Sequence, residues 1–146
     1  MALRMDPDRV IIGEVRGGEA FPMLMAMSQG NNGSMCTLHA DSARTVFPKL
    51  AAYVAMADTN LPVETVNLLV ATALHLVVHL DIVDGVRMVA SVREVVDADG
   101  AQIVSNEVFV PGSDGLGVPG YPLREATQVL LEEHGYLMGA VAGSRR

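Results

Sequence analysis

Two short apolar runs near the amino terminus have the composition of buried strands. The first covers residues 9–16 and starts with Val10, Ile11 and Ile12, which are all β-branched. The second covers residues 34–38. Each run is followed by polar or glycine-rich residues, which interrupt strands. We therefore expect two strands, each leading through a loop into a helix.

Three segments repeat apolar residues at helical spacing. The predicted helices cover residues 19–29, 42–57 and 62–74, and Glu19 stands where the first should open. The expected buried face of the first helix carries Met23, Leu24 and Met27, and Met25 could belong to it as well. The face of the second carries Val46, Leu50, Tyr53, Val54 and Ala57, and that of the third carries Val66, Leu69, Val70 and Ala73. A methionine stripe could instead form a binding surface, although core packing is its commoner use.

The middle of the chain changes to a period of two, which is typical of strands. Over residues 75–83 one face would carry Leu76, Val78, Leu80 and Ile82, and the other His75, Val77, His79 and Asp81. After the turn signal Asp84-Gly85, two more strands are predicted over residues 86–96 and 101–110. These strands should form an antiparallel hairpin or meander.

The last part of the chain differs in composition from the rest. Residues 111–122 hold four glycines and three prolines and predict a linker. An amphipathic helix is expected over 123–134, followed by a frayed tail to Arg146. Its acids are most simply a solvated face: Glu125, Glu132 and Glu133. The predicted divisions are therefore 1–110, 111–122 and 123–146, and the order of elements predicts an α/β fold, mostly parallel, with an antiparallel extension.

Composition changes this picture in two ways. Half of the 146 residues are apolar and the mean hydropathy is positive, yet no stretch reaches the roughly 18 uninterrupted apolar residues of a membrane span. We therefore expect apolar surface that becomes buried against something outside this sequence. The net charge of −7 argues against a nucleic-acid partner, because phosphate contacts need clustered Lys and Arg.

The single cysteine and one pair of histidines are candidates for a reactive thiol and a metal site. Cys36 excludes an internal disulfide and fits a reducing cytoplasm, and its apolar strand context favours a buried, inert thiol over a reactive one. His75 and His79 could chelate a metal if they lay on a helix. On a strand they would be roughly 13 Å apart, which is too far for one ion, so we expect no metal site there.

Candidate chemistry lies at the ends of the first two strands. Glu14 and His39 each fall at the carboxyl end of a predicted parallel strand, where ligands of open sheets bind. A carboxylate there can orient water, an imidazole can contact a phosphate, and Arg16 can spread negative charge. The alternatives stay open from spacing alone. Glu14 and Arg16 could simply neutralise each other, and His39 could be an ordinary histidine at a strand end.

Two long motifs in this region resemble a known family. Residues 3–20, LRMDPDRVIIGEVRGGEA, resemble the Walker B region of the type II/IV secretion-system ATPases, most closely the branch that serves tight-adherence pili. Residues 30–42, GNNGSMCTLHADS, resemble the histidine box of the same family. The resemblance covers about residues 2–110. It implies a RecA-like ATPase fold, a hexameric ring on the cytoplasmic face of the inner membrane, and ATP hydrolysis coupled to pilus assembly or protein secretion.

Carried over by position, the resemblance assigns roles to three residues. Glu14 would be the Walker B acid that activates the attacking water and reaches magnesium through water. His39 would be the histidine-box residue near the γ-phosphate, and Arg16 the arginine that follows the acid. Asn31 replaces a histidine that is common in the family's loop, so we expect no catalytic role for that loop. ATP and magnesium are the implied cofactors.

The phosphate-binding part of the family's site has no counterpart in these residues. A P-loop needs Gly-x-x-x-x-Gly-Lys-Ser/Thr, whereas the single lysine, Lys49, follows Phe47-Pro48 with no glycine near it. We expect the chain to be the carboxyl-terminal part of the ATPase domain, lacking the P-loop strand, as a truncated, split or decayed copy. It would bind ATP poorly and be inactive alone. Alternatively, it is a non-enzymatic module that docks into a ring.

The resemblance also implies partners. These are further copies of the chain or an amino-terminal half, together with platform proteins of the inner membrane, and no nucleic acid. The expected location is the cytoplasm, peripheral to the inner face of the cell membrane.

Overall fold

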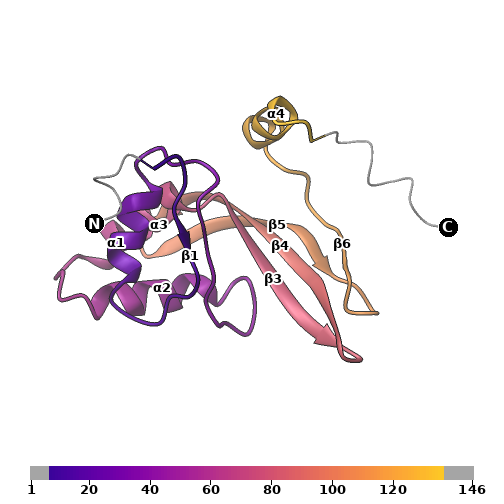
Figure 1. Ribbon diagram of the computed structural model, residues 1–146, viewed down its shortest axis with the longest axis horizontal. Helices are drawn as coiled ribbons and strands as arrows, with labels where there is room; N and C mark the ends of the chain where they lie inside the picture. Colours follow the sequence, from indigo (N-terminus) through magenta and orange to yellow (C-terminus); the bar gives the residue numbers. More distant parts are fainter. Residues whose placement is uncertain (1–6, 137–146) are drawn as a thin grey trace.

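The computed structural model describes residues 7–136. Along the chain it contains β1 (Ile11–Ile12), α1 (Ala20–Met27), β2 (Met35–Cys36), α2 (Val46–Ala55), α3 (Val63–Ala73), β3 (Leu76–Val83), β4 (Val86–Asp99), β5 (Gln102–Pro111), β6 (Gly117–Pro119) and α4 (Glu125–Glu133). Helices α1–α3 and the β1–β2 pair gather at one end, and the β3–β4 hairpin projects away from them (Figure 1). The mixed α/β class is thus confirmed, with one parallel and one antiparallel sheet.

The parallel sheet is much shorter than the predicted strands over 9–16 and 34–38. Only Ile11↔Met35 and Ile12↔Cys36 pair in register. Backbone bonds continue the ladder on both sides, from Met35 N–H to the Val10 carbonyl (3.0 Å) and from Val15 N–H to the Thr37 carbonyl (2.9 Å). The prediction that both faces of these strands are buried is wrong for one face. Ile11 is 70% exposed and Met35 60%, because no described segment covers that side.

The antiparallel sheet has the strand order β3-β4-β5-β6. Its long central strand β4 is rich in β-branched residues and pairs with both β3 and β5, with register shifts that bend the sheet. The alternation predicted for β3 is confirmed. The apolar set of that strand is nevertheless the exposed one: Leu76, Val78, Leu80 and Ile82.

A single hydrophobic core lies between the three helices and the near end of both sheets. Leu24, Leu50 and Val70 are its fully buried centres, one from each helix. Val15 enters it from the parallel ladder and Val95 from β4. Burial of such side chains contributes about 1.5–3 kcal/mol each. The predicted methionine stripe is core as expected for Met23 and Met27, whereas Met25 faces outward.

Helix α2 begins four residues later than the predicted start at residue 42. The side chains of Ser42 and Thr45 bond to each other's backbone N–H groups, at 3.2 Å and 3.1 Å. This reciprocal bonding holds residues 42–45 in a turn, because short hydroxyl side chains offer the backbone an alternative to the helix. The helix follows directly after it.

The segment predicted as a linker, residues 111–122, contains a strand. Its residues Gly117–Pro119 form β6, which pairs antiparallel with β5 through Phe109↔Pro119 and Val110↔Val118. The tight turn before it requires glycine, because Gly115 has φ +80° and a Cβ there would lie 2.4 Å from Val83. The glycines and prolines thus shape a turn and an edge strand.

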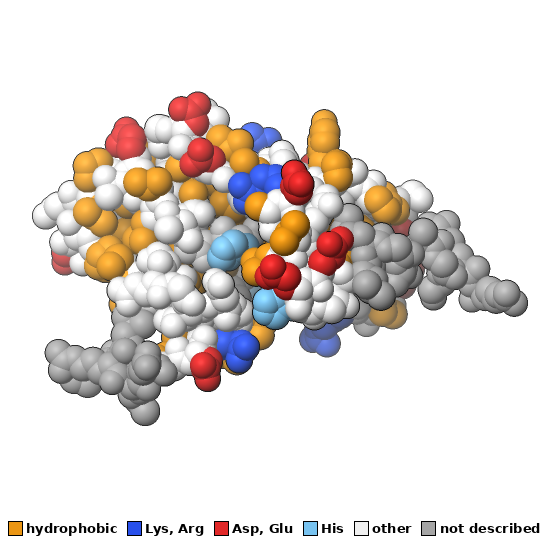
Figure 2. Space-filling view, turned by 90° about the horizontal axis from the view of Figure 1, so that it is seen from above, with side chains coloured by type: hydrophobic (Ala, Val, Ile, Leu, Met, Phe, Trp, Pro, Cys, Tyr) orange, Lys and Arg blue, Asp and Glu red, His pale blue; other side chains and the backbone are white. Residues whose placement is uncertain are grey.

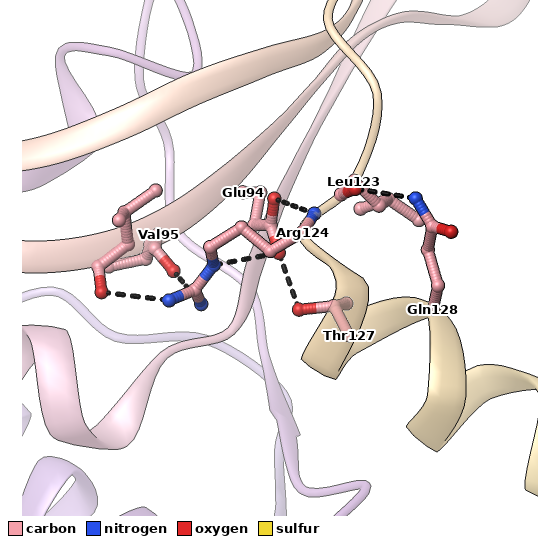
Figure 3. Close-up of polar contacts among 7 residues, drawn as sticks. Glu94, Val95, Leu123, Arg124, Thr127 and Gln128 are labelled. Atoms are coloured by element: carbon pink, nitrogen blue, oxygen red, sulfur yellow. Dashed lines mark hydrogen bonds and ion pairs between the residues drawn. The ribbon is translucent and has the colours of Figure 1, made fainter.

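The carboxyl-terminal helix is fastened to the sheet by a buried carboxylate (Figure 3). Glu94 of β4 accepts hydrogen bonds from the Arg124 backbone N–H (3.1 Å), from Arg124 Nε (3.2 Å) and from the Thr127 hydroxyl. The Arg124 guanidinium also donates to the carbonyls of Val95 (2.9 Å) and Val96 (3.1 Å). Helix α4 itself buries no residue, and Glu125, Glu132 and Glu133 are exposed, as predicted. The predicted tail from 137 onward lies outside the described residues.

The surface agrees with the sparse positive charge of the sequence. Seen from above, patches of hydrophobic side chains lie open at the helical end, and some of the few basic side chains are next to acidic ones (Figure 2). Within residues 7–136, no helix combines the length and the apolar character needed to cross a membrane.

Candidate functional site

The parallel ladder places the predicted acid and imidazole side by side. Glu14 follows β1 by two residues and His39 follows β2 by three, so both leave the carboxyl ends of neighbouring parallel strands. The Thr37 hydroxyl donates to the Gly13 carbonyl at 2.5 Å and ties the two loops together just beyond the strands. The predicted juxtaposition therefore rests on backbone pairing, and not on the two side chains alone.

Glu14 contacts both of the other predicted site residues. Arg16 Nη2 lies 2.5 Å from Glu14 Oε2, and His39 Nε2 lies 3.1 Å from Glu14 Oε1. The side chain of Glu14 is 26% exposed, whereas those of Arg16 and His39 are 76% and 89% exposed. The carboxylate is thus the inner group of the three, and the two cation-capable groups lie outside it in solvent.

The charges around Glu14 keep it ionised. The hydrogen bond from Arg16 is the largest cause that holds the pKa of Glu14 below its ordinary value of 4.5, and the charge of His39 is a smaller one. The same hydrogen bond raises the pKa of Arg16. Near neutral pH the site therefore holds a carboxylate next to a guanidinium.

One oxygen of Glu14 lacks a hydrogen-bond partner among the described residues. Oε1 is buried and lacks a hydrogen-bond partner in the described part of the chain, although His39 stands within ion-pair distance of it. Buried carboxylate oxygens normally accept hydrogen bonds. The oxygen therefore has an unused capacity to accept a hydrogen bond, next to the His39 ring.

The described residues fit only part of a nucleotide-magnesium site. Glu14 could hold magnesium through water, and Arg16 and His39 are suited to an anionic phosphate. Residues 7–136 hold no group of three or more His, Cys, Asp or Glu side chains that could ligate a metal directly. The lysine and glycine cradle that would hold the other phosphates has no counterpart in the sequence.

Glu19 belongs to this site, although the sequence pointed only to its place at the start of a helix. Its Oε1 accepts hydrogen bonds from the backbone N–H of Arg16 (2.6 Å) and of Gly17 (3.1 Å). The bond from Arg16 is the largest cause that holds the pKa of Glu19 below its ordinary value. An acid right after Gly-Gly was the only available signal, because such backbone bonding depends on a loop shape that residue types do not specify.

The loop between α1 and β2 has a structural role in this molecule. Asn31, which stands where the family commonly has a histidine, donates through Nδ2 to the Ala26 carbonyl at 3.0 Å. This bond fixes the loop to the end of α1. Among the described residues, no hydrogen bond joins Asn31 to Glu14, and no catalytic role is assigned to the loop.

The other candidate groups of the sequence form no ion pair with Glu14 among the described residues. Cys36 is partly buried in β2, and burial raises the pKa of its thiol, as expected for an inert cysteine. His79 lies within strand β3 and His75 just before it, which is the arrangement that disfavours a shared metal ion. A cavity of about 260 Å³ between α2, α3 and the loop joining them is lined by none of the three predicted site residues.

Comparison with known proteins identifies the family. The family model described as "Type II/IV secretion system protein" matches residues 1–110. The type IV secretion system protein PtlH of Bordetella pertussis is 40% identical over 80 residues, which cover 53% of this chain and 23% of PtlH. VirB11 of Brucella suis is 35% identical over 80 residues, covering 53% of this chain and 22% of VirB11.

A solved structure shows the same relationship. The crystal structure of the VirB11 ATPase from the Brucella suis type IV secretion system, in complex with sulphate, matches with a TM-score of 0.57 and 33% identity. The match covers 62% of this chain and 30% of the VirB11 chain. It confirms the expected RecA-like fold. The chain spans less than a quarter of the length of the curated relatives named here. On the match over residues 1–110, the chain belongs to the type II/IV secretion system protein family.

Proposed function

We propose that this chain carries the water-activating half of the ATPase site of a secretion or pilus-assembly motor. The observation that carries the proposal is the state of the Glu14 carboxylate. One oxygen is paired with Arg16, and the other is buried, lacks a hydrogen bond and faces His39. Since the carboxylate stays ionised, it can orient and polarise a water molecule for attack on a phosphate.

Each of the three side chains has a distinct task in this proposal. Glu14 orients the attacking water and holds magnesium through a second water. His39 contacts the γ-phosphate, and Arg16 stabilises the negative charge that develops during transfer. Bound magnesium would neutralise phosphate charge. Arg16 and His39 are exposed, so both can move toward a nucleotide.

The phosphate cradle would come from another polypeptide segment. Lys49, the single lysine, lies in α2 with no glycine loop around it. The parallel sheet of only two strands supports a neighbour that adds a strand at its edge, and the open face at Ile11 and Met35 supports a neighbour that covers it. We propose that the chain hydrolyses ATP only with such a neighbour, inside a hexameric ring at the cytoplasmic face of the inner membrane. ATP and magnesium would be its cofactors, and platform proteins its further partners.

Co-expression tests this proposal. The chain is produced alone and together with the P-loop-bearing portion of a family member, and phosphate release is measured with ATP and magnesium. We expect activity only for the pair. Glu14→Gln should lower the turnover of the pair by about 100-fold or more, because a positioned general base contributes that much. Glu64→Gln, at an exposed acid in the first turn of α3, is the matched control and should leave turnover unchanged.

Besides an inactive pair, two results would contradict the proposal. One is robust hydrolysis by the chain alone. The other is a pair whose hydrolysis does not respond to Glu14→Gln, since the working acid would then lie elsewhere.

A second candidate function is favoured by the same exposed apolar surface. Ile11 and Met35 pair in register and present their side chains to solvent on one side of the ladder. A chain that docks through this face could act by assembly alone. In that case the co-expressed pair would assemble, and it would stay inactive with or without Glu14→Gln.

A further inference from the structure

The loop that carries Arg16 is held by a side chain outside the proposed catalytic group. Glu19 starts helix α1, but its carboxylate turns back toward the preceding loop. Its Oε1 accepts the backbone N–H of Arg16 at 2.6 Å and that of Gly17 at 3.1 Å. One carboxylate oxygen thus satisfies two backbone donors of the loop that precedes the helix.

The side chain of Arg16 has little other support. The Arg16 side chain is 76% exposed, and it forms an ion pair with Glu14. An exposed arginine has many accessible rotamers, and ordering it costs conformational entropy. The direction in which the side chain leaves the backbone therefore decides how often the guanidinium meets Glu14. That direction is set by the backbone that Glu19 holds.

We infer that Glu19 is a positioning residue, which fixes the backbone of Arg16 and Gly17 so that the guanidinium lies on one oxygen of Glu14 and leaves the other for water. The inference rests on the proposed function for its catalytic meaning. Its structural content, that Glu19 controls the Arg16–Glu14 contact, stands apart from any ATPase activity. Glu19 touches no reacting atom, so its effect passes through Arg16.

Glu19 could act as a nearby negative charge or as a positioning residue, and the two roles predict opposite changes in the pKa of Glu14 when Glu19 is replaced. If Glu19 acted only as a nearby negative charge, its removal would lower the pKa of Glu14, since one repulsive neighbour is lost. If Glu19 positions Arg16, its removal releases the guanidinium that is the largest cause of the lowered pKa of Glu14. The pKa of Glu14 would then rise. The sign of the change separates the two roles.

The test is a carbon-13 NMR titration of the Glu14 carboxyl in the full chain without nucleotide. Arg16→Ala defines the full upward shift. We expect Glu19→Ala to shift the Glu14 titration upward by at least half as much, and to speed hydrogen exchange at the amides of Arg16 and Gly17. Glu19→Gln keeps an acceptor oxygen and removes the charge, so it should leave the titration in place or lower it.

Two further variants keep the result interpretable. Glu19→Asn provides a favourable helix N-cap but is one methylene shorter, so it preserves the helix start while losing the reach to Arg16. It should behave like Glu19→Ala even if the alanine variant folds poorly. Glu64→Ala removes an exposed acid from the first turn of α3 and should change nothing. The inference is overturned if Glu19→Ala and Glu19→Asn leave the Glu14 titration unchanged or lower it.

Turnover then links the inference to the proposed function. In the co-expressed pair, Glu19→Ala and Arg16→Ala should each lower kcat by about tenfold with KM unchanged, and the double variant should lose no more than Arg16→Ala alone. A fully additive double variant would overturn the inference. An inactive wild-type pair would instead contradict the proposed function, while the titration would still decide the role of Glu19.

Discussion

Two of the three ion pairs between a glutamate and an arginine in residues 7–136 differ in nearly every physical respect. Glu14 and Arg16 are two residues apart, and their side chains are 26% and 76% exposed. Glu94 and Arg124 are 30 residues apart, and Glu94 is 0% exposed while Arg124 is 40% exposed. Glu94 is surrounded by donors, namely the Arg124 backbone and side chain and the Thr127 hydroxyl, whereas Glu14 keeps one oxygen without a hydrogen bond.

The contrast indicates that the Glu94–Arg124 pair supports the structure, whereas the Glu14–Arg16 pair can exchange its contacts with a ligand. A buried carboxylate is tolerable only while its donors remain, so the second pair ties the carboxyl-terminal segment to the sheet. An exposed pair contributes little to stability, because water and salt compete for both partners. The first pair is therefore free to exchange its contacts with a ligand, and the second is not.

The largest effect should come from removing the arginine of the buried pair. Arg124→Ala leaves Glu94 without its guanidinium partner and should lower the free energy of unfolding by about 3 kcal/mol. Urea unfolding followed by circular dichroism measures it. Arg87→Ala, at an exposed position of the same sheet, is the control and should change the free energy by less than about 0.5 kcal/mol. Similar values for both variants would remove the distinction between the two pairs.

An intermediate effect should appear when the two glutamates are replaced by glutamine. Glu94→Gln keeps the shape but weakens charge-assisted hydrogen bonds to Arg124 and Thr127, at a cost of about 1.5 kcal/mol. Glu14→Gln should leave the free energy of unfolding unchanged within error. Paired urea titrations at neutral pH compare the two. Equal losses would mean that Glu14 supports the fold as much as Glu94 does.

The smallest effect concerns acid and salt at the exposed pair. The folded pKa of Glu14 lies below its ordinary value of 4.5, so its contribution is complete above that pH and is lost as the pH falls through the folded pKa. Between about pH 5 and pH 3, Arg16→Ala should therefore lose stability less steeply than the wild type. In about 1 M salt the two slopes should converge, because the Debye length shrinks to about 3 Å. Slopes that stay apart in high salt would indicate a buried interaction.

The features that depend on neighbouring residues in the chain could be predicted from the sequence. Alternation over 75–83 predicts β3 because the side-chain period of a strand is fixed by the backbone. The meeting of Glu14 and His39 follows from parallel pairing of two successive strands, which needs no knowledge of side-chain packing. The buried faces predicted for α1, α2 and α3 agree with the structure, and the start of α2 differs where a hydroxyl-rich turn competes with the helix. The helix predicted over 123–134 is present as α4 but buries no residue.

The features that depend on contacts between distant residues could not be predicted from the sequence. The contact of Glu94 with Arg124 joins residues 30 apart, and neither residue has a local pattern that names the other. Strand β6 was missed because glycines and prolines in 111–122 suppress strand propensity, whereas the edge position of the strand tolerates both. The exposed side of the short parallel ladder was expected to be buried, because apolar sequence alone does not say whether a covering segment is present.

The close packing of Gly18 has a mechanical consequence. A Cβ at this position would lie 3.2–3.3 Å from backbone atoms of Met56 and Ala57, so the loop after Arg16 rests directly on the end of α2 without an intervening side chain. Such close backbone contact leaves no space between the loop and the end of α2. A shift of the last turn of α2 would therefore act directly on the backbone at Gly18, two residues after Arg16.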